Sequence, residues 1–376
     1  MARFLQTSDW QLGMTRYFLE GEAQARYTAA RIDAIRSIGE VARREQCDFV
    51  VVAGDVFDSN LLSTRTVSRA LEAMATISCP VYLLPGNHDP LDASSVYRSP
   101  VFTAACPPGV VVLDPGLHRV ASDVEILAAP WLVKPALVDL AAQALAGVDD
   151  PPPGLVRLLL AHGPIDVLTP DDHDPARISL ATLESAIEQG RLHHVALGDK
   201  HSRMSVGSTG RVHYSGSPEV TDVRDDAPGD VLVVDVTADG TYSVTAHRVG
   251  TWAFTTLRRH VNDLDDIDDL DAELAAIDPK DRTVVRTILL GTLTLAEKAR
   301  LDDLLEKWGA VLAAPPTHAG LDDIAVVLDP DDLTDLGVGG FVAGAVADLA
   351  ERASGSDPDI TARDALSLLH RLASAR

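Results

Sequence analysis

The feature of this chain that most constrains its fold is a repeated pattern in which a short apolar run ends at an aspartate, asparagine or histidine. The runs have the length and composition of strands that are buried on both faces. In open α/β sheets, ligands bind outside the carboxyl ends of the strands. The pattern therefore predicts one site built from the polar residues that follow the runs, which are Asp9, Asp55, Asn87, His162 and Asp199.

The order of elements along the chain predicts the α/β class. We expect strands at residues 3–8, 49–53, 80–84, 110–113, 125–129, 156–161 and 194–197, and helices at residues 22–44, 63–77 and 180–189. Between residues 211 and 249 the pattern changes to alternating β. The turn at residues 238–240 (Ala-Asp-Gly) predicts a hairpin of strands 231–236 and 242–246.

The length predicts more than one domain. At 376 residues the chain exceeds the size at which a single hydrophobic core usually stops growing. We expect a large domain at residues 1–254, a smaller βαβ-type domain at residues 255–338 and two short helices within residues 339–376. The last segment either packs on its own domain or docks another protein. The acidic tract at residues 262–273 predicts a solvated amphipathic helix, because its acids lack the spacing of a calcium loop.

Composition and charge limit the class of protein. An apolar fraction of 46% with 23% charged residues is typical of a globular protein. We see no leader-like or membrane-spanning apolar stretch, so we expect a cytoplasmic protein with no membrane partner. The three cysteines are too few and too separated for a disulfide framework or a sulfur-rich zinc site. The formal charge is −24, so binding of a polynucleotide would need metal cations, a local basic patch or a partner subunit.

Five polar clusters suit a two-metal phosphoesterase. They are Asp9-Trp-Gln11, Gly54-Asp55-Val-Phe-Asp58, Gly86-Asn87-His88-Asp89, Ala161-His162-Gly163 and Gly198-Asp199-Lys-His201. A turn or a helix cap explains each cluster alone, but five clusters at the ends of five predicted strands indicate one site. Such an enzyme needs a carboxylate that bridges two metals and an acid that protonates the leaving oxygen. Asp55 suits the bridge, and His88 suits the acid.

This series of motifs resembles the calcineurin-like metallophosphoesterase family, and more closely its DNA-repair nuclease branch, which includes the bacterial SbcD-type subunit. The closer resemblance rests on residues 54–58 (Gly-Asp-Val-Phe-Asp), residues 214–218 (Tyr-Ser-Gly-Ser-Pro) and the size and pattern of the C-terminal region. It implies an α/β sandwich of two mixed sheets flanked by helices, followed by a smaller α+β capping domain. It also implies two divalent metal ions, one held by Asp9, Gln11, Asp55 and His201, the other by Asp55, Asn87, His162 and Asp199. By the same resemblance, His88 is the catalytic histidine and Asp89 orients it.

Two positions depart from the family pattern. The first motif normally reads Asp-x-His and the last reads Gly-His-x-His, but this chain has Gln11 and Asp199 in place of the two histidines. Oxygen ligands suit harder cations, so we expect manganese, with magnesium as the alternative, rather than zinc. A second interpretation is that one metal site is weakened or empty, which would leave a poor enzyme or a scaffold.

The resemblance implies a subunit of a DNA nuclease, either an exonuclease or an endonuclease, that acts in DNA repair with an SbcC-type coiled-coil ATPase. Whether the subunit forms a homodimer, as its relatives do, stays open. No phosphate-binding loop of the Gly-x-x-x-x-Gly-Lys-Ser/Thr form occurs in the chain, so any use of ATP would belong to the partner. The alternative is a stand-alone phosphodiesterase or phosphatase that acts on a small nucleotide-like substrate, which the acidity of the chain favours.

Several other polar residues have ordinary structural explanations. We expect His173 in a turn, His193 and His194 at the edge of a loop, and His213 facing outward on a strand. Two roles stay open for Trp10, which either stacks on a base or shields the metal site, or packs against the following helix. Lys200 lies between the last two proposed ligands, where it could touch phosphate.

Overall fold

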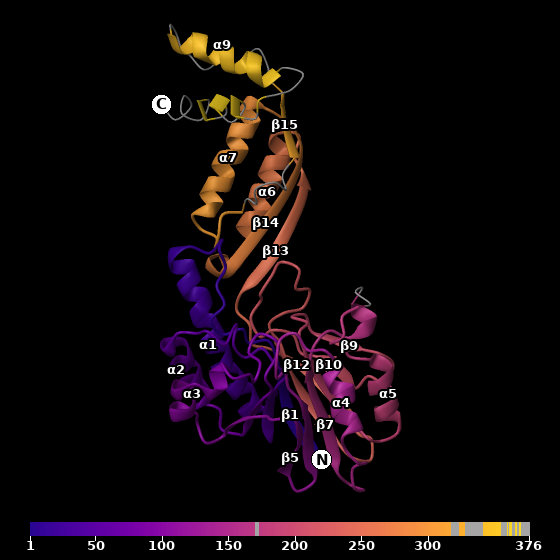
Figure 1. Ribbon diagram of the computed structural model, residues 1–376. Coiled ribbons are helices and arrows are strands. Elements are labelled where there is room, and N and C mark those ends of the chain that lie inside the picture. Colours follow the sequence, from indigo (N-terminus) through magenta and orange to yellow (C-terminus); the bar gives the residue numbers. More distant parts are fainter. Residues whose placement is uncertain are drawn as a thin grey trace. The chain divides into compact units, whose positions relative to one another are not determined.

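The computed structural model describes residues 1–169, 173–316, 323–327 and 341–354, together with residues 359, 361–362, 365–366 and 368–369. The chain forms two compact units (Figure 1). Unit 1 contains residues 1–17 and 24–252, and unit 2 contains residues 18–23 and 253–376. None of the helices in the described ranges is long and apolar enough to cross a membrane.

The first sheet of unit 1 contains the N-terminal apolar runs. Four parallel strands lie in chain order, β1 (Ala2–Thr7), β2 (Phe49–Val52), β3 (Val81–Leu83) and β4 (Val110–Val112). On the other side of β1 lies the hairpin of β11 (Asp230–Val236) and β12 (Tyr242–Arg248), with β11 antiparallel to β1. The predicted hairpin is confirmed, and it makes the sheet mixed.

The second sheet of unit 1 has the order β5-β6-β7-β8-β10-β9. Its strands are β5 (Gly116–Ala121), β6 (Val124–Ala129), β7 (Val156–His162), β8 (His194–Gly198), β9 (Met204–Val206) and β10 (Val212–Tyr214). The four inner strands are parallel, and β5 and β9 pair antiparallel at the two edges. Parallel pairing places the carboxyl ends of β7 and β8 at the same edge of the sheet.

Hydrophobic cores join the sheets and their helices in layers. One core contains apolar residues of both sheets, among them Val51 of β2 and Leu158 of β7. The helices α1 (Gly21–Arg44), α2 (Thr64–Met74) and α3 (Pro100–Ala105) pack on the first sheet, and α4 (Leu140–Ala146) and α5 (Leu180–Glu188) pack on the second. Short 3-10 turns, η1 (Val96–Arg98) and η2 (Asp166–Leu168), lie in the connections. The predicted α/β sandwich of two mixed sheets flanked by helices is confirmed.

Some local predictions were wrong. The strand β5 and the helices α3 and α4 were not predicted, because each is short and carries little apolar periodicity. His193, His194 and His213 are buried, rather than at a loop edge or facing outward. The ring of His194 is hydrogen-bonded to Gln6 Oε1 and to the Tyr242 hydroxyl, both at 2.8 Å. Local periodicity does not reveal such a buried polar group, because its partners come from distant strands.

Unit 2 contains a parallel sheet of order β13-β14-β15. Its elements are β13 (Ala253–His260), α6 (Leu264–Ala276), η3 (Lys280–Arg282), β14 (Thr283–Thr294), α7 (Leu295–Gly309) and β15 (Asp323–Val327). Leu270 of α6 and Leu304 of α7 are buried in a shared core with residues of β14. Asp265 and Asp268 of α6 are exposed, as expected for a solvated amphipathic helix. Strand β13 was not predicted.

The C-terminal segment contains α9 (Phe341–Ser354), whose buried residues include Val346 and Ala350. Residues 328–340 and most of residues 355–376 lie outside the described residues, so only part of the segment predicted at 339–376 can be compared. The roles assigned to residues 255–338 as a capping domain and to residues 339–376 as a docking segment stay predictions.

Candidate metal centre

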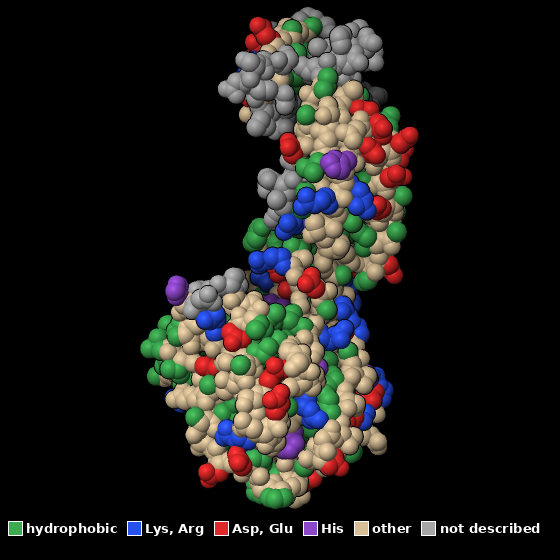
Figure 2. All heavy atoms as spheres, turned by 90° about the vertical axis from the view of Figure 1, so that its right-hand side faces the viewer, with side chains coloured by type: hydrophobic (Ala, Val, Ile, Leu, Met, Phe, Trp, Pro, Cys, Tyr) green, Lys and Arg blue, Asp and Glu red, His purple; other side chains and the backbone are tan. Residues whose placement is uncertain are grey.

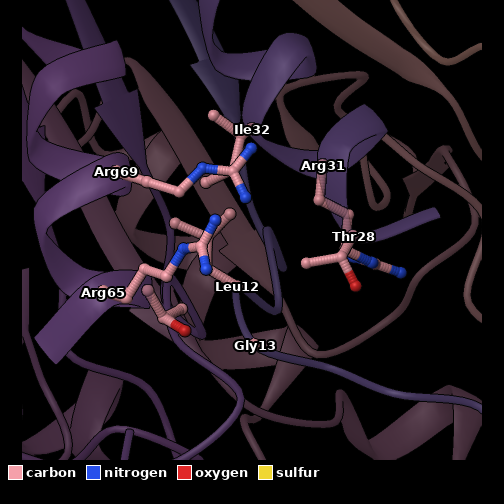
Figure 3. A pocket seen from close by; sticks show the side chains of 8 residues that line it. Leu12, Gly13, Thr28, Arg31, Ile32, Arg65 and Arg69 are labelled. Carbon is pink, nitrogen blue, oxygen red and sulfur yellow. The ribbon is translucent and has the colours of Figure 1, made fainter. Parts of the chain in front are cut away.

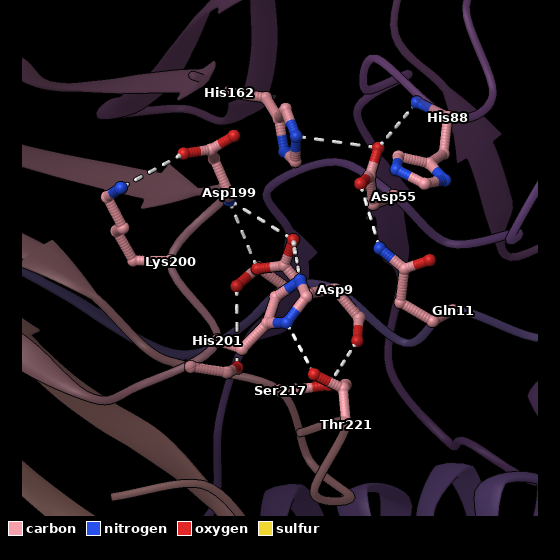
Figure 4. Close-up of polar contacts among 12 residues, drawn as sticks. Asp9, Gln11, Asp55, His88, His162, Asp199, Lys200, His201, Ser217 and Thr221 are labelled. Atoms are coloured by element: carbon pink, nitrogen blue, oxygen red, sulfur yellow. Dashed lines mark hydrogen bonds and ion pairs between the residues drawn. The ribbon is translucent and has the colours of Figure 1, made fainter. Parts of the chain in front are cut away.

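The predicted ligands come together where strands of both sheets of unit 1 end (Figure 4). Asp9, Asp55 and Asn87 follow strands of the first sheet, whereas His162 and Asp199 lie at the ends of strands of the second. Backbone hydrogen bonds hold the first two loops together, since Asp9 N donates to Gly54 O and Gln11 N donates to Asp55 O, each at 3.0 Å. The expectation that one site collects these strand ends agrees with the geometry.

The most compact group in this region consists of Asp9, Asp55 and His162. Among the residues that the structure describes, these three buried side chains offer ligand atoms that all lie within 4.8 Å of one another. Two carboxylates and an imidazole are ordinary ligands of divalent transition metals.

The ring of His162 is oriented as a metal-binding histidine would be. Its Nδ1 lies 2.9 Å from the carbonyl oxygen of Ala53, so Nδ1 carries the proton and donates it. Its Nε2 lies 3.2 Å from Asn87 Oδ1 and 3.4 Å from Asp55 Oδ1. A lone pair, an amide oxygen and a carboxylate oxygen therefore converge, and only a proton or a cation between them relieves their repulsion.

The pKa shifts of the site residues also indicate that the site favours a positive charge. Burial alone would lower the pKa of His162, but the carboxylates of Asp55, Asp9 and Asp199 outweigh it and raise the pKa to about 9. Burial also raises the pKa of Asp9 well above its usual range. Metal ligands must give up their protons, and a divalent cation would replace the proton that the carboxylates hold on His162. The donor set therefore fits such an ion.

His201 is fixed by a chain of hydrogen bonds. Its Nδ1 lies 2.5 Å from Thr221 Oγ1, and the Thr221 hydroxyl lies 2.9 Å from Asp225 Oδ2. An ionised carboxylate only accepts, so Thr221 donates to Asp225 and accepts from His201 Nδ1. The lone pair therefore lies on Nε2, which is 3.9 Å from Asp9 Oδ1. Burial lowers the pKa of His201, which favours this neutral form.

Gln11 reaches the site through its amide nitrogen. Its Nε2 donates to Asp55 Oδ2 at 2.9 Å, and its buried Oε1 has no hydrogen-bond partner among the described residues. In this orientation Gln11 supports the predicted bridging carboxylate and does not present a ligand atom. Rotation of the amide by half a turn would bring Oε1 towards Asp55 and remove the hydrogen bond.

Asp199 takes part mainly through its backbone. Its N–H lies 3.1 Å from Asp9 Oδ1 and 3.2 Å from Oδ2, which orients the Asp9 carboxylate. Its own carboxylate is partly exposed and lies 3.8 Å from the Lys200 ammonium. Lys200 is therefore at the rim of the site, paired with a proposed ligand.

Backbone strain is concentrated at the proposed ligands. Five non-glycine residues in the described part of the chain have positive φ, and four of them are Asp9, Gln11, Asp55 and Asp199. Residues in this region of backbone space cost free energy and persist where the surrounding structure requires them. The strained turns allow backbone and side chain of these residues to face the same site.

His88 is exposed, and its backbone N–H donates to Asp55 Oδ1 at 2.9 Å. Its Nδ1 lies 2.9 Å from the carbonyl oxygen of Asp58. The Asp89 carboxylate accepts from Gly86 N, Phe57 N and the Tyr97 hydroxyl. Burial raises the pKa of Asp89 to about 6. Asp89 therefore shapes the loop that carries His88.

Several supporting residues were not predicted. Thr221 and Asp225 orient His201, Ser217 donates to the backbone oxygen of Asp9, and Trp131 Nε1 donates to the His162 carbonyl oxygen at 2.7 Å. The only sequence signal was the Tyr-Ser-Gly-Ser-Pro segment, which contains Ser217 and precedes Thr221. Trp10 is buried in the core that includes residues of α1 and donates to Thr7 Oγ1, which fits the packing role and leaves no exposed face for stacking on a base.

A family model described as calcineurin-like phosphoesterase matches residues 2–234. The chain is 31% identical over 257 residues to the D subunit of the SbcCD nuclease of Rhodobacter capsulatus, which covers 57% of this chain and 62% of that protein. It is 26% identical over 258 residues to the corresponding protein of Escherichia coli (strain K12), and this match covers 57% of this chain and 60% of that protein. The matched region thus spans about 60% of the length of these relatives.

A shorter similarity joins the chain to DNA double-strand break repair protein Mre11 of Aeropyrum pernix, at 30% identity over 139 residues and 32% of each chain. The solved structure of TT1561 of Thermus thermophilus overlaps 66% of this chain and 99% of its own, with a TM-score of 0.42 and 11% identity. That score is too low to support an inference about function.

Proposed function

Because the chain belongs to the calcineurin-like phosphoesterase family, we propose that it is a metal-dependent phosphodiesterase and, more narrowly, a DNA nuclease subunit that acts in DNA repair. The observation that carries this proposal is the convergence of His162 Nε2, Asn87 Oδ1 and Asp55 Oδ1, beside a second lone pair on His201 Nε2 that faces Asp9. These atoms fit divalent cations on either side of Asp55.

The ligand residues would hold two ions, with Asp55 between them. Asp9 and His201 belong to one side, and Asn87 and His162 to the other, with Gln11 and Asp199 supporting or completing the set. Bound divalent ions of this kind lower the pKa of a coordinated water and polarise the phosphoryl oxygen. The protein's contribution is to hold carboxylates, amide and imidazoles in place before the substrate arrives.

His88 is proposed as the acid for the leaving oxygen. Its Nδ1 is engaged by the Asp58 carbonyl, so Nε2 of the exposed ring is the atom left to carry the transferred proton. General acid catalysis of this kind contributes about 10²- to 10⁴-fold. Asp89 and Tyr97 act indirectly, by fixing the loop between β3 and η1.

Manganese is the ion that we propose, with magnesium as the alternative. Gln11 and Asp199 stand where the family pattern has two further histidines, so only His162 and His201 remain as imidazoles beside the carboxylate and amide oxygens. Oxygen ligands suit harder cations than zinc. Activity measured with each ion after chelator treatment tests this choice, and activity with zinc alone would contradict it.

The names of the relatives support DNA as the substrate. Two of them are subunits of a nuclease, and a third is a DNA double-strand break repair protein. We propose a partner of the SbcC type, a coiled-coil ATPase, which the C-terminal segment 339–376 would dock, while residues 255–338 act as a capping domain. A homodimer is part of the same proposal.

The test is a paired assay of the purified chain with manganese on single- and double-stranded DNA and on bis-p-nitrophenyl phosphate. We expect cleavage of DNA, reduced about 10²- to 10⁴-fold by His88→Ala. Hydrolysis of the small ester without action on DNA would support the small-substrate alternative, which the charge of −24 favours. Inactivity on every substrate after metal loading would support a scaffold with a degraded metal site, which the orientation of Gln11 favours.

A further inference from the structure

A second polar feature of unit 1 is a cavity of about 200 Å³ that we call the arginine pocket, whose lining includes Arg31, Arg65, Arg69, Thr28 and Thr66 (Figure 3). Its volume is several times the share of about 30 Å³ that one water molecule has in the liquid. No carboxylate is among the described residues that line it. The cavity therefore has room for a polyatomic anion.

Residues of the arginine pocket are neighbours of the proposed metal ligands in the sequence, and one hydrogen bond connects the two groups. Leu12 and Gly13, which also line it, directly follow Gln11. Arg31 Nη1 donates at 2.8 Å to the carbonyl oxygen of Trp10, the residue between Asp9 and Gln11.

The positions of Arg65 and Arg69 lower the stability of the helix that carries them. They lie one turn apart near the start of α2, whose first turn has no acidic residue. Like charges at this spacing repel, and positive charge is unfavourable near a helix N-terminus. Neither arginine makes a side-chain hydrogen bond or ion pair with any residue that the structure describes. Figure 3 shows their guanidinium groups next to each other.

Arg31 is buried without a carboxylate partner in the described part of the chain. It is 3% exposed and donates to neutral acceptors, including the Val220 carbonyl oxygen and the Tyr27 hydroxyl. Its Nε has no partner, and within the described ranges no carboxylate lies within 4 Å of its guanidinium. Burial raises the pKa of Glu219, and the charge of Arg31 partly opposes this shift. The Glu219 oxygens, however, accept hydrogen bonds from Thr251 and Trp252. A buried charge that no carboxylate neutralises is costly, which favours an external anion.

We propose that the arginine pocket binds a phosphate group of a polynucleotide substrate, next to the phosphate that the metal centre hydrolyses. This inference rests on the proposed function. Guanidinium groups match phosphate oxygens with paired hydrogen bonds, and threonine hydroxyls add further donors. On the face drawn in Figure 2, Lys and Arg side chains of unit 1 are scattered among acidic ones. The arginine pocket differs, because three arginines and no carboxylate line it in a chain of charge −24.

The test measures binding of a labelled single-stranded oligonucleotide to the full chain by fluorescence anisotropy, in chelator so that no metal contributes. Arg65→Ala with Arg69→Ala removes two partly or fully exposed side chains, so the variant should fold, which circular dichroism checks. We expect the affinity to fall about tenfold. The slope of log K against log salt should become less steep by about 0.7 for each phosphate that the variant no longer neutralises.

The matched control is Arg43→Ala with Arg44→Ala, which removes the same charge from the exposed last turn of α1. It should bind like the unchanged chain. Equal weakening by both double variants would show that only total charge matters, and would overturn the proposal. Absence of binding by the unchanged chain would overturn it too.

A calorimetric titration with inorganic phosphate separates two sources of the anion. Weak binding of free phosphate beside tight binding of the oligonucleotide supports the polynucleotide assignment, whereas binding of free phosphate that matches the oligonucleotide would contradict it. Hydrolysis of bis-p-nitrophenyl phosphate by the metal-loaded chain is scored separately. Failure of that assay counts against the proposed function, and failure of the binding test counts against the pocket alone.

Discussion

At the scale of single residues, the site depends on which ring nitrogen each histidine leaves free. His162 donates Nδ1–H to a carbonyl oxygen, and His201 donates Nδ1–H to Thr221. Both rings therefore turn Nε2 towards carboxylates. A partner that fixes the tautomer of a ligand histidine is worth about 10- to 100-fold in metal affinity or activity.

Thr221→Val tests this role, because valine keeps the shape of the side chain and removes the acceptor of His201 Nδ1–H. We expect the manganese affinity, measured by isothermal titration calorimetry, to fall about 10- to 100-fold. Thr245→Val on the exposed side of β12 is the matched control and should leave it unchanged. An affinity equal to that of the unchanged chain would show that Thr221 does not position the ring.

His194 predicts how stability depends on pH. Burial holds the pKa of His194 well below its ordinary value of 6.5. As pH falls through 6.5, the unfolded chain takes up a proton at this residue and the folded chain does not, so the folded state loses stability. The loss is up to about 1.4 kcal/mol per pH unit below that value.

Urea unfolding at pH 7 and pH 5 measures this dependence. We expect His194→Gln to show a smaller loss of stability between the two pH values than the unchanged chain. His118→Gln, at a half-buried position of β5, should behave like the unchanged chain. If His194→Gln kept the full pH dependence, other groups would have to account for it.

At the scale of elements, glycines before the ligands let the strand ends approach each other. A Cβ at Gly86 would lie 2.2 Å from Asp55 Oδ1 and 2.4 Å from Asp55 N, and backbone atoms do not yield cheaply. The loop after β3 therefore packs closely against the loop after β2 at Asp55, the predicted bridging residue.

Gly86→Ala should destabilise unit 1 by about 1–3 kcal/mol, the usual range for overpacking, and should weaken manganese binding by displacing Asp55. The control is Gly109→Ala, before β4, where an added Cβ meets no atom within 4 Å. Urea unfolding and calorimetric titration measure the two effects. An unchanged midpoint and affinity in Gly86→Ala would mean that the loops move apart easily.

The sequence predicted best those elements that carry a clear local pattern of apolar and polar residues. Continuous apolar runs predicted β2 and β7, and the polar residues at their ends predicted Asp55 and His162. The pattern did not predict the partner of His88, because the Asp58 carbonyl reaches it through the fold of a loop. It did not predict which Gln11 amide atom faces Asp55, because that depends on the charges around it.

At the scale of the whole molecule, the buried carboxylates of the centre make stability depend on metal. Asp9 and Asp55 are buried within the compact group of proposed ligands. An ion that binds only the folded chain stabilises it by about 2.7 kcal/mol at 100 times its dissociation constant. This corresponds to a rise of roughly 5–10 °C in the melting temperature of a domain of this size.

Calorimetry with and without manganese measures that rise. We expect it in the unchanged chain and expect chelator to abolish it. Asp55→Asn should lose most of it, because this change removes a charge from the predicted bridge. A rise of the same size in Asp55→Asn would place the bound metal elsewhere.

The central claim is that this cluster makes the chain a metal-dependent phosphodiesterase. The most direct measurement is the rate of bis-p-nitrophenyl phosphate hydrolysis by chelator-treated protein before and after addition of manganese, in the unchanged chain and in Asp55→Asn. The account predicts no hydrolysis without metal, hydrolysis after manganese is added, and loss of that activity in the variant. Hydrolysis that survives the chelator, or that Asp55→Asn retains in full, would contradict it.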